Sequence, residues 1–218
     1  MDHALQADER PDGRLFEVEL FTQRVVELAG EGGGEAADEL LYVLAGTGRL
    51  LLGEAEHELR EGVAVFVPAG TPWSAEGTAR AVSVLVHDPA AGAAEPGVAD
   101  LASADRGTAT AGREFLLGPD CPSATQFVGL IPRGQAPDHY HLYDEVIYVL
   151  EGEGFLEIGG ERAPIRAGTC IHLPRTVVHC LANTGAAEMR VLGVFRPAGS
   201  PAEAYYPDGT RAVVPDES

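Results

Sequence analysis

Three histidines and one glutamate in the second half of the chain have the spacing of metal ligands. His139 and His141 are two residues apart, Glu145 follows four residues later, and His179 lies further along the chain. Residues two apart in a strand share a face, so the imidazoles of His139 and His141 would point the same way. Imidazoles with a carboxylate suit a borderline divalent ion and leave coordination positions open for substrate or oxygen. The four residues predict one divalent transition metal per chain, with Fe, Mn, Ni, Co and Zn as candidates.

The segments around these residues have the pattern of short strands. Gly and Pro recur at intervals of roughly 6 to 12 residues, and the stretches between them are rich in Val, Leu, Ile and Phe, as in 40–44 and 146–150. Regular short strands separated by turn residues predict an antiparallel sandwich or barrel. Helical periodicity is present only around residues 98–104, so we predict an all-β protein.

The chain repeats itself. A shift of 106 residues places the segment 39–48 on the segment 145–154, with the shared sequence pattern Glu, Tyr-Val-Leu, Gly and Gly. The register continues without a gap, and the matched pairs are Gly53/Gly159, Arg60/Arg166, Gly62/Gly168 and Pro68/Pro174. A fixed-period match of turn residues indicates a tandem duplication.

The duplication predicts two domains. Residues 1–88 are expected to form the first barrel, 113–197 the second, and 198–218 a C-terminal tail. Residues 89–112 are rich in Ala, Gly, Pro, Ser, Thr and Asp, a composition that predicts a linker.

The second copy resembles the cupin superfamily, because it carries both of the family's motifs. The residues that match are Gly134, His139, His141, Glu145 and Gly152 in the first motif and Gly168, Pro174, His179 and Asn183 in the second. Thr176 stands where the family has glycine, so the turn there is expected to differ. The resemblance implies two tandem cupin barrels of the double-stranded β-helix, jelly-roll type. It also implies that His139, His141, Glu145 and His179 bind one metal inside the second barrel.

The first copy has lost most of these ligands. The 106-residue shift places the four ligand positions on Gly33, Glu35, Glu39 and Trp73. Two carboxylates without imidazoles are a poor transition-metal site, and the indole of Trp73 is expected to fill the former metal cavity. The resemblance therefore implies a bicupin with a degenerate N-terminal barrel.

The sequence indicates the function less directly than the fold, because cupin sites of this kind serve many reactions. We favour a metal-dependent dioxygenase or other oxidoreductase acting on a small oxygen-bearing substrate, with Glu145 as a candidate catalytic base. A decarboxylase, an isomerase, a hydrolase and a non-catalytic small-molecule or metal-binding protein are the alternatives. A mostly apolar cavity would suit aromatic substrates, whereas Arg or Gln near the metal would suit a carboxylate or a sugar.

The amino-acid composition argues against several classes of binding partner. The formal net charge of −19 argues against nucleic acid, which clustered Lys and Arg bind, and the absence of lysine excludes lysine Schiff-base chemistry. The polar N-terminus and the lack of a long apolar run predict a cytoplasmic protein that binds no membrane. A small-molecule substrate is the expected partner, and a homodimer is left open. Structural packing is expected for His172 and the three cysteines, and Gln126 is a candidate to orient an imidazole.

Overall fold

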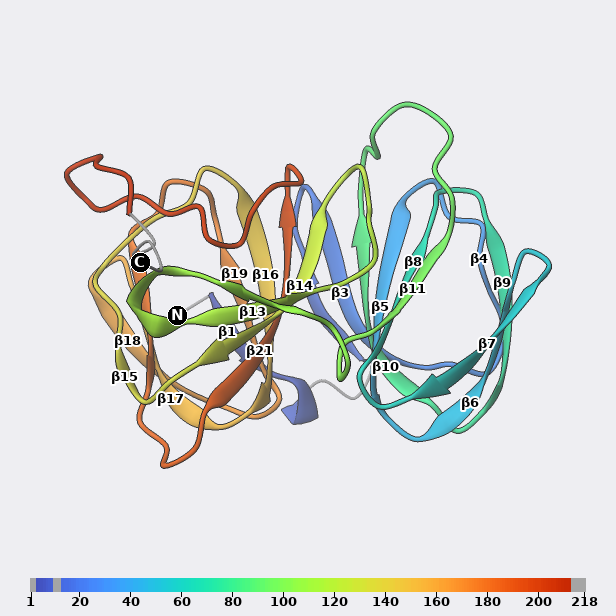
Figure 1. The fold of residues 1–218 in the computed structure, drawn as a ribbon, viewed down its shortest axis with the longest axis horizontal. Helices are drawn as coiled ribbons and strands as arrows, with labels where there is room; N and C mark the ends of the chain where they lie inside the picture. Colours follow the sequence, from blue (N-terminus) through green and yellow to red (C-terminus); the bar gives the residue numbers. More distant parts are fainter. Residues whose placement is uncertain (1–2, 10–12, 213–218) are drawn as a thin grey trace.

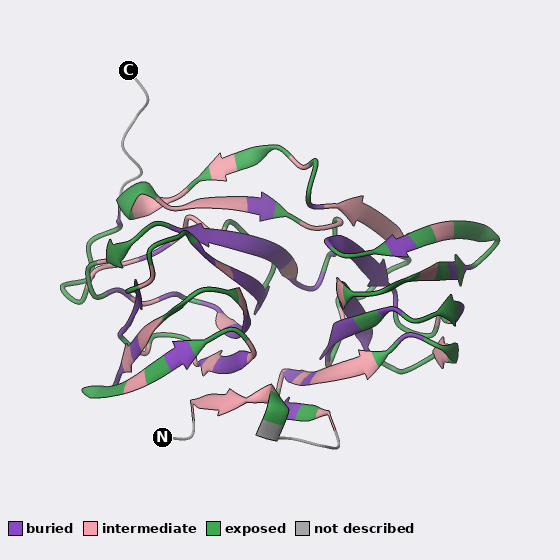
Figure 2. Cartoon of the chain, turned by 90° about the horizontal axis from the view of Figure 1, so that it is seen from below, coloured by how far each residue is buried: buried purple, intermediate pink, exposed green. Residues whose placement is uncertain are grey.

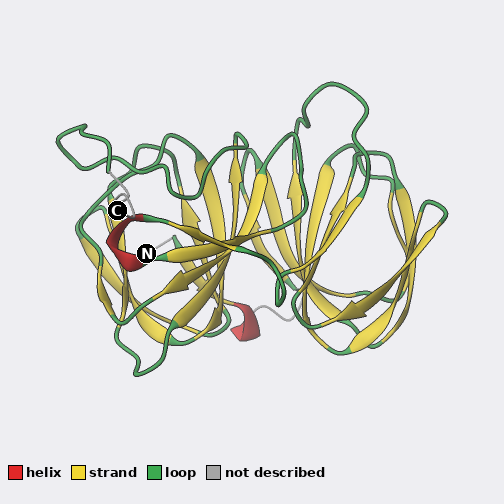
Figure 3. Ribbon diagram, viewed as in Figure 1, coloured by secondary structure: helices red, strands yellow, loops and turns green. Residues whose placement is uncertain are grey.

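The computed structural model describes residues 3–9 and 13–212. The outermost parts of the predicted first domain and tail, residues 1–2 and 213–218, lie outside the described residues. Two β-barrels lie side by side (Figure 1), and nearly every ordered element is a strand (Figure 3). Two short 3-10 helices, η1 (Ala7–Glu9) and η2 (Thr110–Gly112), complete the described elements. The prediction of an all-β fold with two tandem barrels is confirmed.

The first barrel consists of a six-stranded and a four-stranded antiparallel sheet. The larger sheet has the order β11-β8-β5-β10-β3-β2, and the smaller sheet has the order β4-β9-β6-β7. The larger sheet contains β2 (Arg14–Glu17), β3 (Phe21–Glu27), β5 (Asp38–Ala45), β8 (Val63–Val67), β10 (Arg80–Val86) and β11 (Gly97–Asp100). The smaller sheet contains β4 (Gly30–Gly33), β6 (Thr47–Leu52), β7 (Ala55–Arg60) and β9 (Pro72–Gly77).

The second barrel repeats this plan with a seven-stranded and a four-stranded sheet. The larger sheet has the order β1-β19-β16-β21-β14-β13-β12, and the smaller has the order β15-β20-β17-β18. The larger sheet contains β1 (Ala4–Gln6), β12 (Arg106–Thr108), β13 (Glu114–Leu117), β14 (Thr125–Ile131), β16 (Asp144–Glu151), β19 (Thr169–Leu173) and β21 (Met189–Arg196). The smaller sheet contains β15 (Gly134–Gln135), β17 (Glu153–Ile158), β18 (Glu161–Arg166) and β20 (His179–Asn183).

The two larger sheets pack against each other between the barrels. Along β5, Leu40 and Tyr42 join an apolar cluster with residues of the second barrel, whereas Leu41 and Val43 face the interior of the first. The strand β16 follows the same alternation, and buried residues line the strands of both barrels (Figure 2). Strands buried on both faces need nearly continuous apolar sequence, which explains the apolar runs of the repeat.

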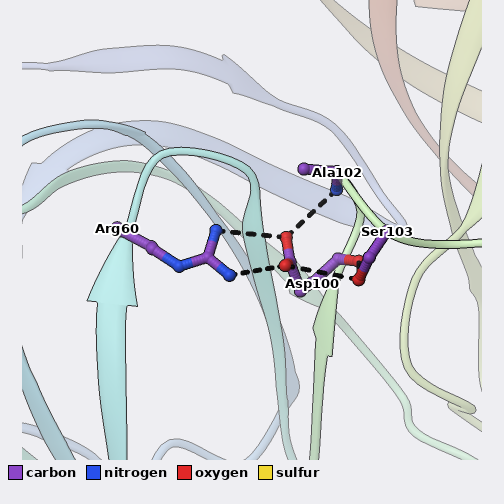
Figure 4. Close-up of polar contacts among 4 residues, drawn as sticks. All are labelled: Arg60, Asp100, Ala102 and Ser103. Atoms are coloured by element: carbon purple, nitrogen blue, oxygen red, sulfur yellow. Dashed lines mark hydrogen bonds and ion pairs between the residues drawn. The ribbon is translucent and has the colours of Figure 1, made fainter.

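The segment between the barrels contains two strands rather than only loop. The strand β11 pairs with β8 of the first barrel, and β12 pairs with β13 of the second. Asp100, at the end of β11, accepts hydrogen bonds from Arg60, from the Ala102 backbone and from Ser103 (Figure 4). The helical periodicity around residues 98–104 was misleading, because the first part of this segment pairs as a strand.

A strand from the N-terminal end of the chain completes the second barrel. The short strand β1 pairs with β19, in the position that β11 occupies beside β8 in the first barrel. The following backbone contacts also match: Ala7 N–H donates to Gly168 O, and Leu101 N–H donates to Gly62 O. The barrels are therefore joined through strand pairing as well as through side-chain packing. Within the described residues, no helix is long and apolar enough to cross a membrane.

Candidate metal centre

The four predicted ligands come from three neighbouring segments at one end of the second barrel. His179 is the first residue of β20, Glu145 is the second residue of β16, and the His-x-His pair lies between β15 and β16. The backbones of His139 and His179 form an antiparallel bridge with N–H to O distances of 3.1 and 2.8 Å. This bridge brings together residues that are far apart in sequence.

Local hydrogen bonds fix the orientation of two of the imidazoles. His139 Nδ1 lies 2.9 Å from the carbonyl oxygen of Pro137, and His179 Nδ1 lies 2.9 Å from that of Val177. A carbonyl oxygen only accepts, so each Nδ1 must carry the hydrogen and each Nε2 keeps its lone pair. Such hydrogen bonds set the tautomer of metal-binding histidines.

The third imidazole depends on the C-terminal segment. His141 Nδ1 donates to the carbonyl oxygen of Glu203 over 2.7 Å, and the ring stacks on Tyr143 with centroids 4.5 Å apart. An antiparallel bridge and a stacked ring pair between Tyr140 and Tyr205 hold this segment against the ligand loop. The residues predicted as a tail therefore close over the barrel and orient one of its ligands.

The three imidazoles form a compact, buried group. His139, His141 and His179 each offer a ring nitrogen, and these nitrogens all lie within 4.8 Å of one another. Burial lowers the pKa of all three, to about 3 for His141, where the charge of His139 adds to the effect. The rings are therefore neutral at physiological pH, which is the form that binds a metal.

Glu145 lies in the same cavity, but it is outside the 4.8 Å group that the imidazoles form. Its side chain is buried, with no hydrogen-bond donor among the described residues. Burial raises its pKa to about 8, against a smaller opposing effect of the Arg113 charge. A Cβ atom at Gly193 would lie 2.7 Å from Glu145 Oε1, so the glycine leaves room for the carboxylate.

The cavity around these residues is small and has mostly apolar walls. Its volume is about 70 Å³, and Phe127, Ile131 and Leu173 contribute to its walls. Arg113 also lines it and donates to the carbonyl oxygen of Leu181 over 2.7 Å. Burial lowers the pKa of Arg113, and its charge contributes to lowering the pKa of the four predicted ligands.

Arg113 was missed in the sequence because it lies at the boundary between the predicted linker and the second domain, away from both motifs. The discriminating feature named above, an arginine near the metal, could have directed attention to it. The sequence nevertheless contains 15 positive side chains, and no spacing rule singles out this one.

Two other residues singled out in the sequence, His172 and Gln126, lie away from the metal cavity. The half-buried His172 has its Nε2 3.3 Å from Asp144 Oδ1, and neither residue lines the cavity. Gln126 donates to the carbonyl oxygen of Leu41 in the first barrel, so it contacts the interface between the barrels. The expectation that Gln126 orients an imidazole is wrong, since the orienting groups are backbone carbonyls.

The turn at Thr176 has the same backbone conformation as the matching turn of the first barrel. The φ of 63° at Thr176 is left-handed, like the φ of 77° at Gly70, the matching residue of the first barrel. The N–H of Thr176 donates to His141 O over 2.7 Å, and that of Gly70 donates to Glu35 O over 2.8 Å. The prediction of a different turn is therefore wrong: a β-branched residue adopts the conformation that glycine favours.

The first barrel differs slightly from the gapless alignment. Trp73 pairs with Leu52 as His179 pairs with Ile158, which confirms their equivalence, but the residue opposite Trp73 is Gly32. The placement of Gly33 at the position of His139 is therefore wrong by one residue. The ligand loop of the first barrel has one extra residue before Glu35.

The half-buried indole of Trp73 occupies space beside the glycine strand. A Cβ atom at Gly32 would lie 2.3 Å from the Trp73 ring, and the ring N–H donates to Glu39 Oε2 over 3.2 Å. Within the described part of the chain, the cluster of metal-ligand side chains is confined to the second barrel.

Known proteins are similar to the chain in part of its sequence or in its fold. L-ectoine synthase of Vibrio atlanticus (strain LGP32) is 35% identical over 77 residues, which cover 35% of this chain and 60% of that one. A putative glyoxylate induced protein of Pseudomonas aeruginosa has a TM-score of 0.73 and 19% identity, covering 88% of this chain and 87% of that one. Oxalate decarboxylase of Bacillus subtilis has a TM-score of 0.66 and 13% identity, with coverages of 88% and 72%.

The curated relatives are matched only in part, since the chain spans 56% to 64% of their length. The structural likenesses have low sequence identity and show the fold alone. The family model of the cupin domain, however, matches both halves of the chain, at residues 29–87 and 126–195. With both barrels matched in this way, the chain belongs to the cupin family and is a bicupin.

Proposed function

We propose that the second barrel is the active site of a mononuclear metal-dependent enzyme that acts on a small, oxygen-bearing organic substrate. The observation that carries the proposal is the convergence of His139, His141 and His179 in one cavity. Each ring donates its Nδ1 hydrogen to a backbone carbonyl, so the Nε2 lone pairs are available to one ion.

The donor set fits a divalent transition metal, with Fe, Mn, Ni, Co and Zn as candidates. Glu145 is the proposed fourth ligand, because it is a buried carboxylate in the same cavity without a donor among the described residues. Structural similarity to an oxalate decarboxylase described with Mn(II) centres makes manganese one metal to test first. One site per chain is proposed, because the first barrel lacks the imidazoles.

The ion and the side chains of the protein would have different roles in the proposed reaction. A bound divalent ion would supply a Lewis acid that polarises a substrate oxygen. Glu145, the carboxylate of the same cavity, is the candidate catalytic base that would accept a proton from the bound substrate. The cavity has mostly apolar walls, and the C-terminal segment that carries Glu203 holds His141 in its binding tautomer.

Dioxygenase or other oxidoreductase activity is the reaction type that we place first, as for many sites with this ligand set. Decarboxylase activity is the second candidate, and the likeness to oxalate decarboxylase favours it. An isomerase, a hydrolase or a non-catalytic small-molecule or metal-binding protein would use the same ligands without oxygen chemistry. We also propose a cytoplasmic protein with no nucleic-acid or membrane partner, and a homodimer as an assembly to test.

Metal analysis followed by an oxygen-uptake screen tests the proposal. The purified protein should hold about one transition metal per chain, and the screen should cover catechols, flavonols and small keto acids, with carbon dioxide release measured in parallel. His179→Ala and Glu145→Gln should both lower metal content, whereas His57→Ala, on β7 of the first barrel, should not. Full metal content in both site variants would overturn the proposed centre.

A further inference from the structure

Arg113 is held beside the metal cavity by a tight loop. The loop 109–113 closes through two backbone hydrogen bonds, from Ala109 N–H to Arg113 O over 2.8 Å and from Arg113 N–H to Thr110 O over 3.3 Å. Ala111 and Gly112 are both left-handed, with φ values of 59° and 68°. Ala109, Thr110 and Arg113 all line the cavity. This loop therefore forms part of the cavity wall and ends on a cation.

The guanidinium is braced against a ligand strand. Its Nη2 donates to the carbonyl oxygen of Leu181 over 2.7 Å, and Leu181 is two residues after His179 on β20. A guanidinium has five N–H donors. Beyond the contact with Leu181, Arg113 has no side-chain hydrogen-bond partner among the described residues.

No acidic side chain in the described part of the chain forms an ion pair with Arg113. Glu114, the acidic neighbour that also lines the cavity, is paired with Arg106 at 2.5 Å. Glu145 shares the cavity, but it is the proposed ligand of the ion. Arg113 is half-buried, and its remaining N–H groups are accessible from the cavity, so they are suited to an anion supplied from outside the chain.

We propose that Arg113 anchors a carboxylate of the substrate, so that the substrate is a small organic acid. The inference rests on the proposed metal centre and adds the substrate class to it. A guanidinium can hold a carboxylate through two parallel hydrogen bonds, which would fix one end of the molecule. Another oxygen of the acid then faces the imidazole cluster, and the apolar walls accommodate a short carbon chain.

The test compares acids with their uncharged esters. Pyruvate, oxalate and succinate would be paired with their methyl esters, and binding would be followed in the visible spectrum of the Co(II)-loaded protein. The same pairs would be compared by thermal shift after chelator treatment. At least one acid should bind the loaded protein about tenfold or more tightly than its ester, as expected for a charge-assisted hydrogen bond.

Variants assign this preference to Arg113. Arg113→Gln should abolish the preference for the acid while keeping metal content, and Arg113→Lys should keep part of it. Arg133→Gln removes the same charge from an exposed residue and should behave as the unchanged protein. Equal affinity for acid and ester in the unchanged protein, or an undiminished preference in Arg113→Gln, would overturn the assignment.

Metal content separates this inference from the proposed function. Normal metal content without a preference for acids overturns the role of Arg113 and leaves the metal centre intact. Absence of metal with a preference for acids in the chelator-treated protein overturns the metal centre and leaves the anion site. If Arg113→Gln does not fold, the partial preference of Arg113→Lys still decides the question.

Discussion

The two barrels place a glutamate at the same position and surround it differently. Glu39 and Glu145 are matched by the repeat. Glu39 on β5 pairs with Leu85 of β10, and Glu145 on β16 pairs with Phe195 of β21. In the first barrel, Ser83 Oγ donates to Glu39 Oε1 over 2.6 Å, and Trp73 donates to Oε2 over 3.2 Å. In the second, Glu145 has no such donor among the described residues.

The difference results from two positions. Ser83 pairs with Leu41 as Gly193 pairs with Ile147, so a glycine replaces the hydroxyl donor in the second barrel. Trp73 is replaced by His179 in the same way. A buried carboxylate must be satisfied by hydrogen bonds or by a cation. The first barrel satisfies it with its own side chains, whereas in the second the proposed ion would satisfy it.

The largest effect expected from this comparison concerns metal stoichiometry. The double change His139→Ala and His141→Ala should reduce metal content from about one per chain to near zero, because a single remaining imidazole does not make a transition-metal site. Trp73→His should not add a second metal, because Gly32 and Glu35 still supply no imidazole in the first barrel. Elemental analysis of the three proteins decides this, and a metal that survives the double change would remove the distinction between the barrels.

A serine at position 193 of the second barrel should weaken its proposed metal site. In Gly193→Ser the new Cβ would lie 2.7 Å from Glu145 Oε1 and 2.3 Å from the Phe127 ring, so the side chains must shift. The hydroxyl could then satisfy Glu145 as Ser83 satisfies Glu39. We expect metal affinity to fall about tenfold or more, by analogy with changes to groups that support ligands.

A matched change checks that the loss is specific. At Gly199 an added Cβ has room, with its nearest neighbour at 3.8 Å, so Gly199→Ser should keep its metal. Titration with Zn(II) against a competing chelator measures both affinities. Unchanged affinity in Gly193→Ser would show that the carboxylate does not need the space that glycine leaves.

Removal of the corresponding donor in the first barrel should cost stability and not metal. Ser83→Ala leaves a buried carboxylate oxygen of Glu39 without its shortest donor, which typically costs about 1–3 kcal/mol. For a chain of this size each kcal/mol lowers the melting temperature by about 2–4 °C. Ser103→Ala, which removes an exposed hydroxyl, should change stability by less than about 0.5 kcal/mol. Thermal melting with parallel metal analysis checks both, and metal loss in Ser83→Ala would contradict the comparison.

The unpaired carboxylate of the second barrel should also appear in the pH dependence of the metal-free protein. Burial raises the pKa of Glu145 from 4.5 to about 8. Between these values the unfolded chain has lost the proton and the folded chain still holds it, so stability falls as pH rises. Glu145→Gln should remove this loss and melt several degrees above the unchanged protein at about pH 8.5, with no difference near pH 4.

The three imidazoles have the opposite effect on the pH dependence of stability. Their pKa values are lowered by burial, so below about pH 6.5 acid protonates the unfolded chain first and stability falls as pH falls. This contribution is present in both proteins and cancels in the comparison. Chelator-treated samples are required, since a bound ion would hold Glu145 ionised. Equal melting temperatures at alkaline pH would show that the carboxylate is better satisfied than the structure indicates.

The repeat and the ligand spacing could be predicted from sequence because both are local regularities. The apolar runs, the turn glycines and the His-x-His pair recur at fixed intervals, and they identified the barrels and the imidazole cluster. The strand β1, the orientation of His141 by Glu203 and the placement of Arg113 depend on contacts between distant segments. No spacing along the chain encodes such contacts, so these features required the structure.

The smallest expected effect concerns the turn that both barrels share. Thr176 adopts a left-handed φ of 63°, which costs a β-branched residue about 1–3 kcal/mol, whereas Gly70 adopts its φ of 77° without that cost. Thr176→Gly should relieve the strain, but glycine loses more conformational freedom on folding, so the net gain should be about 1 kcal/mol or less.

The reverse substitution should have the opposite sign in the first barrel. Gly70→Thr should lower the melting temperature, since it introduces the strain that Thr176 now bears. Both variants keep the backbone N–H that contacts Glu35 or His141, so metal content should not change in either. Thermal melting measures the two shifts. A lower melting temperature in Thr176→Gly, accompanied by metal loss, would mean that the threonine side chain supports the ligand loop, and that the two turns differ in more than strain.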